Sequence, residues 1–90
     1  MDAIALLLTT VFHHVINEPN IEAGFARFEA LTDRTVAYDL FCQTVADGVR
    51  DGLIREPVRL PEGALQCHWH LELTPAGVAA ARALLHGAAR

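Results

Sequence analysis

Two short stretches organise this sequence: DGLI at residues 51–54 and LTPAG at residues 73–77. Gly52 follows a segment whose apolar residues recur with helical spacing, and glycine readily takes the left-handed conformation that ends many helices. Thr74 is a favoured residue for capping a helix start, and Pro75 fits the first helical position because its missing N–H is not needed there. These stretches therefore predict one helix that ends before Gly52 and a last helix that begins at Pro75.

The chain between these stretches favours extended structure. Residues 66–73 alternate between an apolar and a polar face, as a half-buried strand does. The apolar face comprises Cys67, Trp69, Leu71 and Leu73, and the polar face comprises Gln66, His68, His70 and Glu72. Residues 54–60 form an earlier extended run, and residues 61–64 supply turn chemistry between the two. We therefore expect a two-stranded hairpin before the last helix.

Three helices are expected before the hairpin. Residues 2–17 carry apolar side chains at steps of three and four, and Pro19 ends that segment. Asn20 is a candidate cap for a second helix over residues 21–31. After a turn and cap at residues 32–33, a third helix is expected from about residue 34 to residue 51. Its predicted buried residues are Val36, Leu40, Phe41, Val45 and Val49.

This order of elements resembles the winged helix-turn-helix family. The resemblance rests on DGLI, the hairpin and LTPAG, and it spans about two-thirds of the chain. It implies a small α+β winged-helix domain with three helices, a two-stranded wing and a C-terminal helix. It also implies that the third helix occupies the position of the family's recognition helix, and that the terminal helices form a dimer interface.

Length and composition indicate the number of domains, the type of partner and the cellular compartment to expect. Ninety residues predict a single domain, residues 1–90, and a net charge of −4 gives no general attraction for phosphate. Two cysteines that lie far apart and outside a CxxC motif indicate free thiols, so we expect a cytoplasmic protein. Asp2 stands where a signal peptide would be basic, and the apolar run at residues 3–8 is too short to span a bilayer. No membrane association is expected.

A dimeric DNA-binding regulator of transcription is one function that the resemblance implies. The candidate DNA-binding residues are Arg34, Thr35, Tyr38 and Gln43 on the third helix, with Arg55 and Arg59 on the wing. Against this function, residues 33–51 contain four acidic and two basic side chains, and the acids would repel phosphate.

Metal binding and catalysis have less support. His68, His70 and Glu72 share one strand face and are weak metal candidates, but the same pattern fits a solvated face, and a structural zinc site wants four ligands. The chain has no serine, no lysine and no phosphate-cradling glycine motif. We therefore expect no enzymatic activity and no cofactor.

We expect the chain to act by binding protein, itself included. Hydrophobic residues make up 52% of it, which is more than a small monomer readily covers. The segment 2–17 is apolar around much of its circumference, and the last helix is rich in alanine. These features predict a homodimer through the first and last helices, with Leu8, Phe12, Leu84 and Leu85 at the interface. The other interpretation is that the first helix is the central helix of the core.

Overall fold

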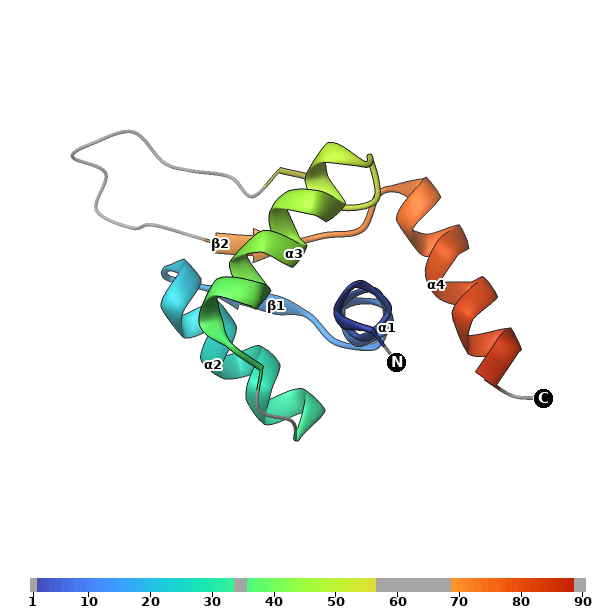
Figure 1. The fold of residues 1–90 in the computed structure, drawn as a ribbon. Coiled ribbons are helices and arrows are strands. Elements are labelled where there is room, and N and C mark those ends of the chain that lie inside the picture. Colours follow the sequence, from blue (N-terminus) through green and yellow to red (C-terminus); the bar gives the residue numbers. More distant parts are fainter. Residues whose placement is uncertain (1, 34–35, 57–68, 89–90) are drawn as a thin grey trace.

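A computed structural model describes residues 2–33, 36–56 and 69–88 of the chain (Figure 1). Its elements, in chain order, are α1 (Ala3–His13), β1 (Ile16–Glu18), α2 (Ile21–Thr32), α3 (Tyr38–Arg50), β2 (Trp69–Leu71) and α4 (Pro75–Ala88). The two strands form one antiparallel sheet. The predicted α+β class is confirmed.

Helix α1 lies between the other helices. Figure 1 shows it end-on, with α2 and α3 on one side and α4 on the other, and it contacts all three. Its start is capped by Asp2, whose carboxylate accepts a hydrogen bond from the Ala5 N–H at 2.9 Å. Leu7 and Leu8 are buried in the core. The interpretation that the first helix is the central helix of the core is therefore confirmed.

The predicted end of the first helix was wrong. The helix stops at His13, and residues 16–18 form strand β1 instead of a last helical turn. Two features of the sequence are compatible with extended backbone here, since Val15 and Ile16 are β-branched and Pro19 biases the residue before it, but pairing with β2 is what selects the strand. Within β1, Ile16 is fully buried and Asn17 is exposed, as neighbouring positions of a strand should be.

The strand pairing also differs from the prediction. Strand β2 pairs antiparallel with β1, with Ile16 opposite Leu71 and Glu18 opposite Trp69. Its other neighbour is Ile54, which forms an isolated bridge to Leu73. The segment that begins at Ile54, which was expected to pair with the second strand, therefore contributes one bridge in the described chain. The strand that pairs with β2 is β1. Residues 57–68, which include the expected turn at 61–64, lie outside the described residues.

The alternation expected for β2 is confirmed where the structure describes it. Trp69 and Leu71 are buried, Glu72 is exposed and His70 is half-buried. The Trp69 ring packs near Phe41 of α3, with the ring centroids 5.8 Å apart. On its other side the ring lies directly on Gly24 of α2, where a Cβ would collide with it. Gly24 therefore gives Trp69 the space to enter the core.

Helix α3 begins later than predicted. Ala37 precedes it with no side-chain cap, and Asp33 instead ends α2 in a left-handed conformation with φ of 52°, which aspartate tolerates better than most residues. Phe41 is buried as expected, but Leu40 is 49% exposed. The prediction that Leu40 is buried was wrong, because consecutive helical side chains diverge by about 100° and Phe41 takes the core-facing position.

The two stretches that organise the sequence meet in the structure. Gly52 ends α3 with φ of 75°, and the Leu53 carbonyl accepts a hydrogen bond from the Thr74 N–H at 3.1 Å. The Thr74 hydroxyl accepts a bond from the Gly77 N–H at 3.0 Å and donates one to the Gly52 carbonyl at 2.6 Å. The predicted glycine stop and threonine cap are both confirmed, and Thr74 also ties them together.

The contact between Trp69 and Gly24 predicts an unusual response to alanine. Gly24→Ala should improve helix propensity yet lower the free energy of unfolding by about 1–3 kcal/mol, because the new methyl group overpacks a fixed ring. Gly87→Ala, in α4, is the matched control, because nothing lies within 4 Å of its added Cβ. Urea denaturation of both variants measures the difference, and a stabilised Gly24→Ala protein would contradict this packing.

Thr74 allows a second stability test. Thr74→Ala removes both hydroxyl bonds, and we expect the free energy of unfolding to fall by about 1–2 kcal/mol. Thr74→Ser retains the hydroxyl and should restore most of the loss. Denaturation curves for the three proteins decide this, since equal losses for alanine and serine would show that the threonine methyl group, and not the hydroxyl, stabilises the junction.

Candidate interaction surfaces

The outer face of α4 is the first candidate surface. Helix α4 packs against α1 at the edge of the domain, far from α2 (Figure 1). Ala81 is fully buried on the inner side. The exposed small residues on the outer side are Ala76, Ala79, Ala83 and Gly87, whose spacing of three and four places them on one helical face. This face, which we call the α4 face, lets another backbone approach closely.

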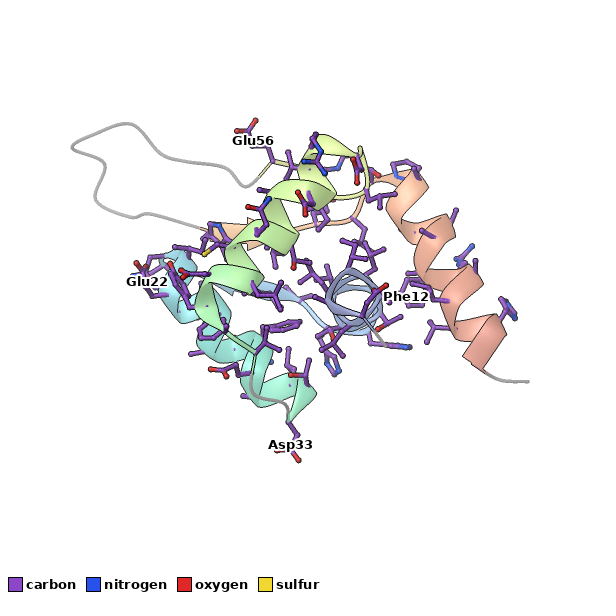
Figure 2. The ribbon with its side chains drawn as sticks, viewed as in Figure 1. Phe12, Glu22, Asp33 and Glu56 are labelled. Carbon is purple, nitrogen blue, oxygen red and sulfur yellow. The ribbon has the colours of Figure 1, made fainter. Side chains whose placement is uncertain are left out.

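Four predicted interface residues lie near this helix, but not all on the surface. Phe12 extends from α1 toward α4 and is half-buried (Figure 2). The Arg82 guanidinium lies over its ring, 5.9 Å from the centroid. Leu84 and Leu85 are half-buried on α4. Leu8, in contrast, is 3% exposed in the core, so the structure removes it from the set that a partner could cover.

The solvent face of α3 is the second candidate surface. It carries Asp39, Leu40, Gln43 and Ala46, all exposed, and its basic residue Arg50 lies 3.1 Å from Asp47 and 3.4 Å from Asp51. Gln43 donates a hydrogen bond to Asp47 at 2.9 Å. The polar groups that could read a base are therefore already engaged with carboxylates of the same helix.

The remaining DNA-binding candidates lie in different parts of the molecule. Arg55 is exposed and pairs with Glu72 across the strand bridge, with Nε and Oε2 3.6 Å apart. Tyr38 packs edge-on against Phe25, with ring centroids 5.2 Å apart. Arg34, Thr35 and Arg59 lie outside the described residues. Among the candidates that the structure describes, no two lie together on a surface of unpaired positive charge.

Tyr38 has a second neighbour that sequence reasoning missed. Cys42 lies one helical turn further along α3. Its side chain is the largest cause of a raised pKa for Tyr38, above the ordinary value of 10.0, and desolvation and the nearby Glu22 and Asp39 add to the effect. The spacing of four residues was the available signal, but spacing alone does not show which rotamers meet.

The weak metal candidates do not form a site in the described chain. His70 lies in β2 and Glu72 just after it, while His68 lies outside the described residues. Among residues 2–33, 36–56 and 69–88, no group of three or more histidine, cysteine or acidic side chains is placed to hold a metal ion.

The described part of the chain has at least two surface hollows of more than 300 Å³. A groove of about 440 Å³ runs beside α3 and is lined by Ile21, Cys42, Val45, Ala46, Val49, Arg50, Glu56 and Trp69. A second hollow of about 340 Å³, which we call the sheet hollow, lies between the end of α1, strand β2 and the start of α4. It is lined by Val11, Phe12, His14, Val15, His70, Leu71, Glu72, Leu73 and Val78. Neither hollow was predictable from the sequence, because the walls of each come from segments that lie far apart in the chain.

Comparisons with known proteins add no further constraint. No protein-family model matches the chain, and neither a curated protein nor a solved structure matches it. Within the described ranges, no helix is long and apolar enough to cross a membrane.

The contact between Tyr38 and Cys42 can be tested directly, since Tyr38 is the only tyrosine in the chain. An ultraviolet absorbance titration of the phenolate should give a pKa above 10.0 for the unmodified protein. Cys42→Ala should lower that pKa toward 10.0, because it removes the side chain that contributes most to the upward shift. Gln43→Ala, on the same helix, should leave it unchanged. An unchanged pKa in Cys42→Ala would rule out this contact as the cause.

Proposed function

We propose that this chain is a non-catalytic winged-helix module that binds protein, and that its first partner is a second copy of itself. One observation carries the proposal: α4 covers α1 with its inner side and turns the α4 face outward at the edge of the domain. A second α4 packed there would cover this face and the half-buried side chains of Phe12, Leu84 and Leu85 beside it.

The order of elements supports the winged-helix part of the proposal. A helix and a short strand precede two helices, Ile54 then bridges to Leu73 just after strand β2, and β2 pairs with the first strand. In such a domain α3 occupies the recognition position.

The DNA-binding alternative ranks second because the arginines on and after α3 are paired with carboxylates. Helix α3 and the described segment that follows it carry Arg50 and Arg55, and each lies beside at least one carboxylate. A phosphate contact would have to break these pairs while Asp39 and Asp47 remain nearby. A protein surface accepts such a face more readily, because ion-paired arginines and carboxylates suit the polar rim of an interface.

Self-association through the α4 face is tested by charge insertion. We expect the unmodified chain to sediment as a dimer, and Ala83→Glu to raise the dimer dissociation constant at least about tenfold, because a two-fold axis brings the two new charges close together. Sedimentation equilibrium over a concentration series measures this, and circular dichroism should show unchanged helicity.

The matched control for this variant is Ala26→Glu. It makes the same change at an exposed position of α2, on the opposite side of α1 from α4. We expect it to dimerise as the unmodified chain does. A monomeric unmodified chain would refute the proposed dimer, and equal weakening by both variants would refute its location on α4.

A further inference from the structure

Aspartate followed by glycine occurs twice in the chain, at Asp47–Gly48 and at Asp51–Gly52. This dipeptide is open to an intramolecular reaction, because glycine has no side chain to shield its backbone nitrogen from the preceding carboxyl group. The nitrogen attacks the carboxyl carbon Cγ, a new C–N bond forms, and the carboxyl OH leaves with the amide hydrogen as water. The structure describes both dipeptides, and their surroundings differ.

Asp47–Gly48 is held inside helix α3. The Asp47 carboxylate accepts a hydrogen bond from Gln43 at 2.9 Å and lies 3.1 Å from Arg50. Gly48 is buried and packs on Ile54, so closely that a Cβ would collide with that side chain. The Gly48 nitrogen reaches the Asp47 side chain only after a backbone rotation at Asp47. That rotation would break α3 within its length and separate Gly48 from Ile54.

Asp51–Gly52 lies just beyond the last residue of α3. Asp51 has a ψ of 2°, outside the usual range for a helix, and its side chain is 57% exposed beside Arg50. Gly52 is exposed as well, and nothing lies within 4 Å of the position that its Cβ would take. The Gly52 N–H donates to the Val49 carbonyl at 3.1 Å. A rotation at Asp51 therefore opens a turn in solvent while α3 stays folded.

We propose that Asp51–Gly52 is a site of spontaneous isoaspartate formation, and that the fold protects Asp47–Gly48 from the same reaction. Attack of the Gly52 nitrogen on Cγ of Asp51 gives a cyclic imide and releases one water. Solvent water then adds to the former backbone carbonyl carbon of Asp51 and breaks its bond to the Gly52 nitrogen. The main chain now runs through Cβ and Cγ, and the former backbone carbonyl has become a free carboxylate. No oxidant or reductant takes part.

The modification falls at the junction between α3 and α4. Isoaspartate adds one carbon atom to the main chain directly before Gly52, which has φ of 75° and whose carbonyl accepts the Thr74 hydroxyl bond at 2.6 Å. We expect the modified chain to lose this bond and to unfold at a lower urea concentration. The proposal is independent of self-association, because Asp51 does not lie on the α4 face.

The test incubates the folded, unmodified chain in water enriched in heavy oxygen, since each opening of the imide leaves one heavy atom in a carboxylate. Trypsin cuts after arginine and the chain has no lysine, so peptide 35–50 reports Asp47 and peptide 51–55 reports Asp51. Mass spectrometry gives both rates, and fragmentation locates the label and distinguishes isoaspartate from aspartate, also in any uncut peptide. Asp51 should take up label at least about tenfold faster than Asp47.

Unfolding supplies the matched control, because both dipeptides are open to solvent in concentrated urea. The two rates should then agree within about threefold. Asp51→Glu keeps the charge but requires a larger ring, which forms more slowly, so it should abolish rapid uptake at residue 51 and leave the rate at Asp47 unchanged.

Three results would overturn the proposal: no uptake at Asp51, equal uptake at the two aspartates in the folded chain, or a ratio that urea does not change. All three are measured on the unmodified chain, so the test stands even if Asp51→Glu does not fold. An isoaspartate fraction that unfolds at the same urea concentration as the fresh chain would contradict the expected effect on the junction.

Discussion

The packing of Trp69 on Gly24 is the contact on which the rest of this fold depends. It joins the only tryptophan of the chain to the backbone of α2, and the ring's other neighbour, Phe41, belongs to α3. Because Trp69 also pairs with Glu18 in the ladder, its position fixes the register of β2 against β1. A shift of one residue would place His70 in the core and the indole in solvent. One ring thus sets the relation between two helices and the sheet.

Charge decides how the outer surfaces of this domain can be used. Arg50 and Arg55 lie beside carboxylates, and the guanidinium of Arg82 lies over Phe12. Arginine suits such planar and paired contacts, whereas diffuse attraction for phosphate needs free positive charge. These three arginines therefore make paired or planar contacts within the domain.

The candidate sites were less predictable than the fold because exposure depends on packing between distant segments. Leu8 and Phe12 are one helical turn apart, yet α1 buries the first in the core and leaves the second half-exposed beneath Arg82. No periodicity distinguishes them, since both belong to the same apolar stripe. The sheet hollow was invisible for the same reason: its walls lie more than fifty residues apart in the chain, from Val11 to Val78.

The sequence by itself determined the features that arise from local chemistry. Gly52 ends α3, Asn20 caps α2, Thr74 caps α4 and Trp69 alternates with His70, because each depends on the conformational or hydrogen-bonding preference of a few neighbouring residues. Only the tertiary structure decided that residues 16–18 form a strand. Ile16 fits a helical stripe and a strand equally well, and what selects the strand is the ladder that β2 offers from more than fifty residues away. Such a partner lies beyond any local pattern, because hydrogen bonds between strands are made by backbone groups that every sequence carries.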